Sequence, residues 1–394
     1  MQKMEGNREY YPLTYPQRSV WVLDKLCPDT SIGVISATLK SDSDLDYELL
    51  QEAFNVMIQR NEGIRIRFTL RDGAPVQYVA PYEYYHLNFI DFRNKPIEEL
   101  YMWDEQMSSI PYGQLDVPLF YFAVAKYNKH STAIYTKVHH LISDAWSVVS
   151  IGNQIMEYYD LLSNGAEIPE EPLPSYLEYI KREKQYLASK KYANDERYWK
   201  EKYQDGLELT MLKPRKNTEA GFRAERKTFV VPRRLSHKIR QHCLDYQTSV
   251  FALFFSALCL YINRVTGKEE VTVGTPVLNR TNPREKEAIG MFISTVPLTV
   301  QITDDIDFKM FCKNIFTEWI SVLKGRSIHM NPSSSMCATN TKERKNCTIS
   351  LFPTKTRNFI EAAASNTRKA VGISAATRPI RFTCISTTGK TTAT

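Results

Sequence analysis

The sequence predicts an α+β fold, in which helices and sheets are mixed along the chain, and three observations support this class. Residues 46–60 (DYELLQEAFNVMIQR) place their apolar side chains on one helical stripe. Residues 64–80 and 119–138 each contain two alternating segments around a short polar turn, which predicts two hairpins. Residues 166–175 (AEIPEEPLPS) are rich in Pro and Glu, which predicts a connector between two parts of the chain.

The elements of the first part follow in order. The first hairpin turns at Asp72-Gly73, a dipeptide that favours tight turns with positive φ. The second hairpin turns at the polar residues 128–130. A helix then begins after Asp144 and ends near Gly165, which suits a left-handed C-cap.

The second part repeats the mixture of helices and strands. We expect a charged helix at about 176–203, a strand at 227–231, an apolar helix at 249–264, a strand at 270–274, an alternating segment at 291–302 and a helix at 307–324. The apolar helix is shorter than the ~18 apolar residues that a membrane span needs, so we interpret it as a buried core helix. The sequence contains no heptads and no short-period repeat.

The distribution of charge and the cysteine content argue against a nucleic-acid-binding protein and against a secreted one. Residues 326–394 carry eleven Lys or Arg and two acidic residues, so the net charge of +7 comes from this end and the rest carries −2. Residues 1–325 are nearly neutral, so they do not predict the basic surface that nucleic-acid binding requires. The seven cysteines form no CxxC pair, and residues 1–17 contain no secretion signal. We therefore expect a cytoplasmic protein with reduced thiols and no membrane association.

Two adjacent histidines, His139 and His140, end the last strand of the second hairpin, and Asp144 precedes the next helix. A histidine at the open end of a sheet can act as a general base, which is worth about 10²–10⁴ in rate. The helix N-terminus adds a partial positive field at the same place. A carboxylate that points back into the fold would be buried and would require a partner.

Three other interpretations of this cluster remain open at the level of the residues. The histidines could be ordinary core or loop residues. His139, His140 and Asp144 could bind a metal, although adjacent strand residues point to opposite faces. A Ser-His-Asp site is a third possibility, but the chain has no GxSxG segment.

The flanking residues add a family resemblance. Residues 139–147 (HHLISDAWS) resemble the HHxxxDG motif of the condensation domains of non-ribosomal peptide synthetases. Five further blocks resemble those of the family, in the same order: TYPQRSVWVLDKL (14–26), RNEGIRIRF (60–68), PSYLEYI (174–180), GTPVLNR (274–280) and IGMFISTVPL (289–298). The match is specific and covers roughly residues 1–325.

The resemblance implies two chloramphenicol-acetyltransferase-like subdomains that form a V, with a tunnel between them for two phosphopantetheine arms. It implies an N-terminal subdomain at 1–170, a partial C-terminal subdomain at 171–325 and a tail at 326–394 that does not belong to the family. It also implies that no metal and no cofactor is bound, because the substrates are carried on 4'-phosphopantetheine arms of carrier proteins. Carrier domains and an adenylation domain of the same pathway are the implied partners.

The resemblance also implies the reaction and the roles of residues. The acceptor amine attacks the donor thioester and an amide forms. His140 would orient or deprotonate that amine, and His139 would be structural. Asp144 would turn inward and form an ion pair with Arg280.

Two positions depart from the family pattern, and two further features differ from those of family subclasses. Ala145 replaces the usual glycine of the motif, which implies a smaller acceptor space, and Ser294 replaces an asparagine. His139 is not the aspartate of the heterocyclising subclass. The order Trp146-Ser147 differs from that of epimerising relatives, in which serine comes first.

The tail after residue 325 lacks Asp, Trp and Tyr and has no sustained periodicity. It is either disordered or out of frame. Codons for residues 325–334 can be chosen so that a shifted frame reads AIHPYEPIL, which resembles the family at this point. A frameshift would leave the second subdomain incomplete and the chain poorly folded or inactive.

The sequence thus predicts a condensation domain that joins a carrier-bound acyl or peptidyl donor to a carrier-bound aminoacyl acceptor. We expect the donor to arrive in trans, since the chain begins with this domain. Two alternatives remain: a stand-alone acyltransferase that uses acyl-CoA, and a non-catalytic domain that only docks carriers.

Overall fold

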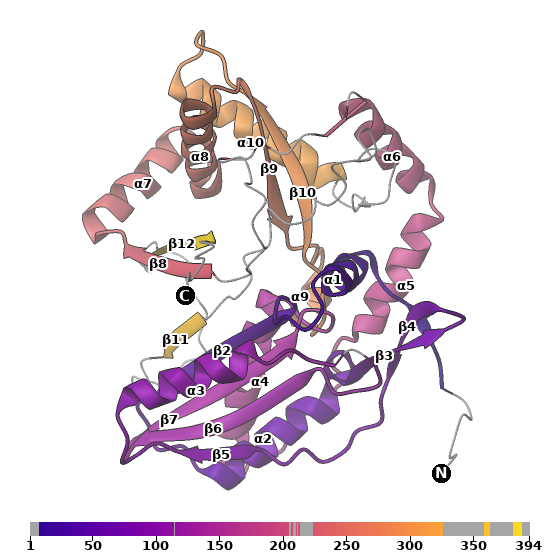
Figure 1. The fold of residues 1–394 in the computed structure, drawn as a ribbon, viewed down its shortest axis with the longest axis vertical. Helices are drawn as coiled ribbons and strands as arrows, with labels where there is room; N and C mark the ends of the chain where they lie inside the picture. The colour runs from indigo at the N-terminus through magenta and orange to yellow at the C-terminus, as the bar shows by residue number, and fades with distance from the viewer. Residues whose placement is uncertain are drawn as a thin grey trace, which may run out of the picture. The chain divides into compact units, whose positions relative to one another are not determined.

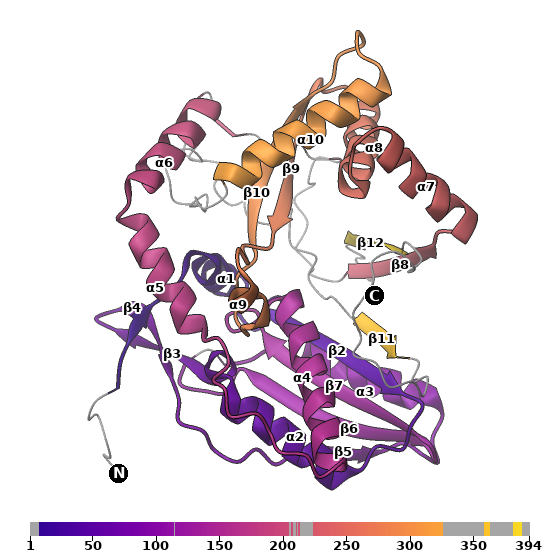
Figure 2. The same ribbon diagram turned by 180° about the vertical axis from the view of Figure 1, so that it is seen from behind.

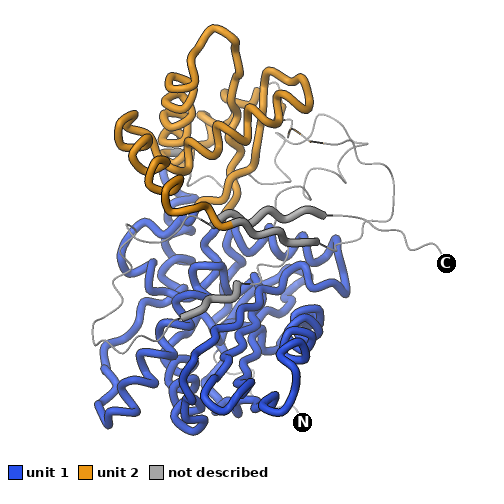
Figure 3. The backbone as a smooth tube through the Cα atoms, turned by 90° about the vertical axis from the view of Figure 1, so that its left-hand side faces the viewer, with its two compact units in different colours: residues 1–189, 278–293, 354–367 blue, residues 190–277, 294–353, 368–394 orange. Residues whose placement is uncertain are grey.

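The structure, a computed structural model, describes residues 8–113, 115–204, 206–207, 210, 212, 224–325, 358–362 and 381–387. The chain divides into two compact units, shown in blue and orange in Figure 3. Unit 1 comprises residues 1–189, 278–293 and 354–367, and unit 2 comprises residues 190–277, 294–353 and 368–394. Each unit mixes helices with strands (Figure 1), so the predicted α+β class is confirmed.

The boundary between the units differs from the predicted one at 170/171. The structure places it between Ser189 and Lys190 and returns residues 278–293 to unit 1. The physical reason is that helix α5 (Tyr176–Leu187) packs into the core of unit 1, where the rings of Tyr176 and Tyr179 lie 5.1 and 4.6 Å from that of Phe292. The connector 166–175 therefore joins two elements of one unit.

Unit 1 is built on a five-stranded sheet in the order β11-β2-β7-β6-β5. Its strands are β2 (Val34–Ser41), β5 (Asn88–Asp91), β6 (Phe120–Asn128), β7 (Ser131–His139) and β11 (Asn358–Ala362). β7 pairs antiparallel with β2 and β6, whereas β5 and β11 add parallel edges. A smaller sheet contains β1 (Tyr11–Pro12), β4 (Ala74–Val79) and β3 (Ile66–Arg71).

Helices cover both faces of the large sheet (Figures 1 and 2). The helices of unit 1 are α1 (Tyr15–Leu26), α2 (Tyr47–Arg60), α3 (Ile97–Ser109), α4 (Ala145–Ser163), α5 and the short α9 (Pro283–Glu287), with the 3-10 turn η1 (Glu62–Arg65) after α2. On one face Phe54 of α2 packs 4.9 Å from Phe122 of β6. On the other, Trp103 of α3 lies 4.9 Å from Tyr135 of β7.

The local predictions for unit 1 are confirmed. The helix predicted at 46–60 is α2, and both hairpins form where expected. Asp72 and Gly73 have φ of 51° and 77°, so the first turn uses the left-handed region that this dipeptide tolerates. Asp144 precedes α4 directly, and Gly165 has φ of 63° after its end.

Unit 2 contains helices α6 (Lys190–Lys202), α7 (Arg233–Asp245), α8 (Val250–Thr266) and α10 (Phe308–Gly325), with strands β8 (Ala224–Val230), β9 (Glu270–Val277), β10 (Ser294–Gln301) and β12 (Arg381–Thr387). β9 pairs with β10, and β8 with β12. The helix predicted at 176–203 is wrong as a single element, because it breaks at Ser189, whose hydroxyl donates to Tyr186 O.

The apolar helix α8 is buried along one face. Ala252, Phe255, Cys259 and Ile262 are buried on one stripe, as expected of a core helix. However, other apolar side chains of α8 are exposed among the described residues, including Tyr261 at 58%. The sequence predicted a buried core helix, and the structure buries one face of it.

Within the tail, for which the sequence predicted either disorder or a shifted frame, the structure describes two strands, β11 and β12. The remaining residues of the predicted tail, at 326–357, 363–380 and 388–394, lie outside the described residues.

Within the described residues no single helix is long and apolar enough to cross a membrane. Helices α7 and α8 pass this test only together, and the chain bends by 100° between them.

Candidate active site

The junction of β7 and α4 brings together the two histidines and the aspartate of the motif. β7 ends at His139 and α4 begins at Ala145, so the segment from His140 to Asp144 forms the connection. Asp144 is the N-cap of α4 and accepts a hydrogen bond from the Ser147 N–H at 2.8 Å. Aspartate is favoured there because its carboxylate satisfies a free helix N–H and complements the helix dipole.

Two hydrogen bonds hold His140 in place, one made by its backbone N–H and one by its ring. Its backbone N–H donates to Gly33 O at 2.7 Å, and its Nδ1 lies 3.2 Å from Ser143 O. A carbonyl oxygen can only accept, so Nδ1 carries the hydrogen. Nε2 of the neutral ring therefore keeps its lone pair.

The surroundings keep His140 neutral. Burial, together with the neighbouring His139, lowers the pKa of His140 to about 4, against the opposing effects of Asp144, the Ser143 carbonyl and Asp24. The residue nevertheless retains part of its surface accessible. At neutral pH this imidazole can accept a hydrogen bond or a proton at Nε2.

His139 is buried and has a different set of contacts. Its Nδ1 accepts a hydrogen bond from the Leu141 N–H at 3.1 Å, and its Nε2 lies 3.1 Å from Asp24 Oδ2. Its ring lies 6.0 Å from that of Tyr112. Both nitrogens face protein groups, which fits a structural residue.

Asp144 and Arg280 form the expected ion pair within unit 1. Arg280 Nη2 lies 2.9 Å from Asp144 Oδ1, and neither side chain is accessible. Asp144 Oδ2 accepts a further hydrogen bond from the Phe292 N–H at 3.1 Å. The carboxylate thus ties the start of α4 to the segment 278–293.

The guanidinium of Arg280 holds that segment together. Its Nη1 donates to Glu285 O and Ala288 O at 2.7 and 3.0 Å, and its centre lies 3.9 Å from the centroid of the Phe292 ring. Burial lowers the pKa of Arg280, while Asp144 opposes this effect. Arginine remains charged when buried, so the pair is an ionic contact in a dry environment.

Ser147 and Trp146 add two more attachments. The Ser147 hydroxyl donates to Gly290 O at 2.8 Å and accepts from the Arg280 guanidinium at 2.7 Å and from the Gly290 N–H at 3.1 Å. Trp146 Nε1 donates to Lys286 O at 2.7 Å. Ala145 is exposed in the first turn of α4.

Gly290 is required by close packing. A Cβ at this position would lie 2.0 Å from the ring of Tyr176. The hydroxyl of Tyr176 donates to Met291 O at 2.6 Å. Sequence reasoning did not assign Tyr176 or Gly290 to the site, although both lie in blocks that match the family.

Two residues of α1 also reach the motif and were missed. Gln17 Nε2 donates to Leu141 O at 3.0 Å, and Asp24 faces His139. The available signal was their spacing of seven residues, which places them on one face of a helix.

The metal interpretation finds no support in the described residues. No group of three His, Cys, Asp or Glu side chains among them is arranged to hold a metal ion. The motif side chains have different partners, since Asp144 forms an ion pair with Arg280 and His139 lies beside Asp24.

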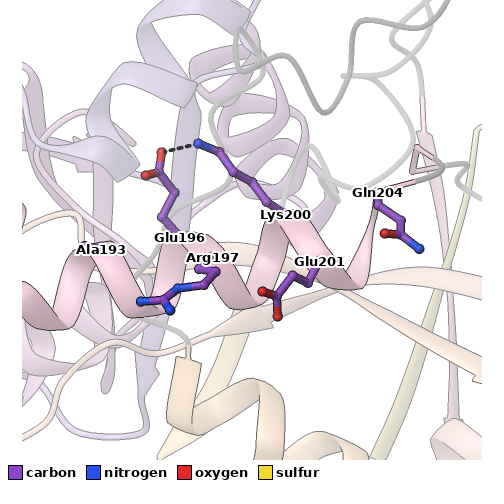
Figure 4. A pocket seen from close by; sticks show the side chains of 6 residues that line it. All are labelled: Ala193, Glu196, Arg197, Lys200, Glu201 and Gln204. Carbon is purple, nitrogen blue, oxygen red and sulfur yellow. Dashed lines mark ion pairs between the residues drawn. The ribbon is translucent and has the colours of Figure 1, made fainter.

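A separate pocket lies along α6 in unit 2 (Figure 4). It is lined by Ala193, Glu196, Arg197, Lys200, Glu201 and Gln204. Lys200 and Glu196 form an ion pair of 3.2 Å one helical turn apart. None of the motif residues reaches it, and we assign it no role in the chemistry.

Comparisons with known proteins match this site and fold. The model of the family described as "Condensation domain" matches residues 7–356. One of the subunits of plipastatin synthase from Bacillus subtilis is 33% identical over 325 residues, which is 82% of this chain. Surfactin synthase subunit 1 of the same organism is 32% identical over 348 residues, or 87% of this chain. The chain spans 13% and 10% of the lengths of these relatives.

Solved structures show the same fold. The first condensation domain of the calcium-dependent antibiotic synthetase, bound to a substrate analogue, has a TM-score of 0.73 at 20% identity, covering 82% of this chain and 75% of that one. The starter condensation domain of rhizomide synthetase, as a variant bound to C8-CoA, has a TM-score of 0.73 at 21% identity, covering 81% and 72%.

The fold is therefore of the chloramphenicol-acetyltransferase-like class. Within this class the chain belongs to the condensation-domain family of non-ribosomal peptide synthetases. Condensation domains catalyse amide bond formation and act on substrates carried by phosphopantetheine arms. The family match continues past residue 325, where we expected the family-like part to end.

Proposed function

We propose that this chain catalyses amide bond formation between a carrier-bound acyl or peptidyl thioester and a carrier-bound aminoacyl acceptor. The single observation that carries the proposal is the position of His140, whose Nδ1 lies 3.2 Å from Ser143 O; with the lowered pKa, this contact favours a neutral ring with its hydrogen on Nδ1 and a lone pair on Nε2. Such a nitrogen can accept a hydrogen bond from an amine N–H.

The proposed step is an aminolysis. The lone pair of the acceptor amine attacks the carbonyl carbon of the thioester, and a C–N bond forms. The C–S bond breaks, and the sulfur leaves as a thiol after receiving the proton that the amine nitrogen loses. His140 Nε2 accepts a hydrogen bond from the amine and orients its lone pair.

The low pKa of His140 favours one of the two roles that the sequence left open. A general base works best when its pKa lies near the operating pH. A value of about 4 makes His140 a weak base at pH 7. We therefore propose orientation of the amine, with the proton passing on to the leaving sulfur, over complete proton abstraction before attack.

The other site residues receive supporting roles in this proposal. Asp144 and Arg280 hold the connection that carries His140, and Ser147 and Trp146 attach α4 to the segment 278–293. Ala145 adds a methyl group at an exposed position beside the motif, and we keep the proposal that it limits the acceptor space.

Carrier and adenylation domains are the proposed partners, with 4'-phosphopantetheine arms as the groups that deliver substrate. The relatives are synthases whose other parts lie outside the match, which favours such partners. A cytoplasmic location belongs to the same proposal, and Cys27, Cys243, Cys259 and Cys312 are buried free thiols that suit a reducing compartment.

A second candidate is transfer from acyl-CoA. It is favoured by one observation, the C8-CoA bound to the variant of the rhizomide starter domain that shares this fold. In this candidate His140 has the same role, but the acyl donor is bound to CoA and not to a carrier protein. The third candidate is a non-catalytic domain that binds carriers without joining their substrates.

The domain assignment also remains a proposal. The division at 170/171 and the out-of-frame tail from about 326 are kept as proposals, beside the two compact units and a family match that extends to residue 356. The test is the nucleotide sequence, in which a family-like shifted frame should continue after codon 325. If no shifted frame after codon 325 encodes a family-like sequence, the proposal of an out-of-frame tail is wrong.

The experiment that tests the function is mass spectrometry of loaded carriers. An octanoyl-loaded donor carrier, or octanoyl-CoA, is mixed with carriers loaded with each of the common amino acids. We expect an acyl-aminoacyl carrier with the wild-type chain, and a yield lower by about 10²–10⁴-fold with His140→Ala. His130→Ala, which removes an exposed histidine, should retain the yield of the wild type.

The outcomes separate the candidates. Product from the carrier-bound donor supports condensation. A parallel reaction contains octanoyl-CoA and free amino acids. Product there, but never from two carriers, would favour the stand-alone acyltransferase. Carrier binding without any product would favour the non-catalytic domain.

A further inference from the structure

Helix α1 touches the motif at two places on one face. Gln17 and Asp24 are seven residues apart, which is about two helical turns, so both point to the same side. Gln17 donates to Leu141 O at 3.0 Å, and Asp24 Oδ2 lies 3.1 Å from His139 Nε2. Both residues are buried. α1 therefore supports the residues on either side of His140.

The protonation of His139 follows from its neighbours. The Leu141 N–H donates to His139 Nδ1 at 3.1 Å, so Nδ1 holds a lone pair. The hydrogen of the neutral ring then lies on Nε2, which faces the carboxylate of Asp24. This N–H is close to Asp24 Oδ2 but is not well aligned with it. Asp24 thus favours the tautomer that lets His139 hold the Leu141 backbone.

Gly33 makes this contact sterically possible. A Cβ at Gly33 would lie 2.6 Å from His139 Nε2 and 2.7 Å from Asp24 Oδ1. The carbonyl of the same glycine accepts the His140 N–H at 2.7 Å. The backbone of His140 is therefore held beside the point where Asp24 and His139 meet.

We propose that Asp24 is a positioning residue for the condensation reaction, which acts through His139 and the Leu141 backbone to fix the place from which His140 projects. The inference rests on the proposed function. Asp24 contacts His139, so its effect on the reacting groups is indirect. A misplacement of about 1 Å in a reacting group can reduce the rate by about 10²-fold.

The kinetic test compares Asp24→Ala and Asp24→Asn with Asp42→Asn, a control that removes an exposed carboxylate near the end of β2. With the full chain and loaded carriers, Asp24→Ala should lower kcat by about 10- to 100-fold and leave KM for both carriers within about twofold. Asp24→Asn keeps an oxygen toward His139 Nε2 and should recover part of the loss. Asp42→Asn should behave as the wild type.

Two results would overturn the inference. One is an Asp24→Ala variant that folds and retains kcat within about twofold. The other is a loss that follows a fall in the melting temperature alone, with equal effects of the Ala and Asn variants. If Asp24→Ala does not fold, Asp24→Asn and Gly33→Ala carry the test, and unchanged kcat in both would overturn the inference.

A second readout needs no activity. Hydrogen exchange at C2 of the histidine rings, followed by mass spectrometry, reports the pKa of His140. Loss of the Asp24 charge alone would lower this pKa, because nearby negative charge favours the imidazolium. Release of the ring toward water would raise it from about 4 toward the ordinary value of 6.5, because burial is the main cause of the low value.

We expect the rise in Asp24→Ala, with a smaller rise in Asp24→Asn. A fall or no change in Asp24→Ala would contradict a positioning role. If the wild-type chain forms no amide with any donor, the proposed function fails, while the exchange result still decides whether Asp24 positions His140.

Discussion

The segment from His139 to Asp144 is held at its two ends by different chemistry. At the Asp144 end, a buried carboxylate meets a guanidinium and two backbone N–H groups with good geometry. At the His139 end, a buried carboxylate faces a neutral imidazole whose N–H is poorly aligned. We infer from this comparison that the Asp144 end contributes more to folding stability, whereas the His139 end mainly positions His140.

The size of the difference follows from the cost of leaving a charge unpaired. A buried ion that loses its partner costs about 3–5 kcal/mol, because it keeps its desolvation penalty without compensation. A hydrogen bond to a neutral group contributes about 0.5–1.5 kcal/mol. Variants at the two ends should therefore separate clearly in unfolding experiments.

The largest effect is expected at the Asp144 end. Asp144→Ala and Arg280→Ala should each lower the free energy of unfolding by about 3–5 kcal/mol. The double variant should lose less than the sum, because the second substitution removes the charge that the first left unpaired. Urea unfolding of the four proteins measures the coupling. Additive losses would mean that the two side chains do not depend on each other.

A smaller effect is expected at the His139 end. Asp24→Ala should lower the free energy of unfolding by about 0.5–1.5 kcal/mol, since it removes one imperfect contact to a neutral ring. The measurement is the same urea titration, with Asp42→Asn as a control that stays within about 0.5 kcal/mol of the wild type. A loss as large as that of Asp144→Ala would erase the distinction between the two ends.

A third expected effect concerns pH. His140 has its pKa lowered from 6.5 to about 4 in the folded chain. The unfolded chain therefore binds more protons between these values, and the stability contributed by the neutral ring is present above pH 6.5 and lost as the pH falls through 4. The difference in unfolding free energy between pH 7 and pH 5 should be smaller in His140→Gln than in the wild type.

Glu183 acts in the opposite direction and must be removed for a clear result. Burial raises the pKa of Glu183 to about 7, although the Tyr15 N–H donates to its carboxylate. Its contribution is present below its ordinary value of 4.5 and is lost as the pH rises through 7. The comparison is therefore best made in a Glu183→Gln background. Equal pH slopes with and without His140 would contradict the lowered pKa.

Much of the fold follows from short-range patterns. The stripe in 46–60 and the turn at Asp72-Gly73 specify α2 and the first hairpin locally, and both form. Helix α3 escaped notice because its buried face includes the polar Asp104 and Ser108, which interrupt the apolar period. The boundary at Ser189 depends on tertiary packing of Tyr176, which no local pattern reveals.

The site divides in the same way. The N-cap role of Asp144 is a local property, since aspartate before a helix predicts it. Its pairing with Arg280 joins residues that are 136 positions apart, and it entered only through the family resemblance. The seven-residue spacing of Gln17 and Asp24 indicates a shared helix face, but it does not name His139 as the partner of Asp24, so only the structure reveals that contact.

Nitrogen-15 NMR of the His140 ring tests the central claim most directly, namely a neutral imidazole with a free Nε2 at the end of a clamped connection. The chain has seven histidines, and the His140 signals are those lost in His140→Gln. At pH 7 the account predicts a protonated Nδ1 and an unprotonated Nε2. A doubly protonated ring, or a hydrogen on Nε2 with a bare Nδ1, would contradict it.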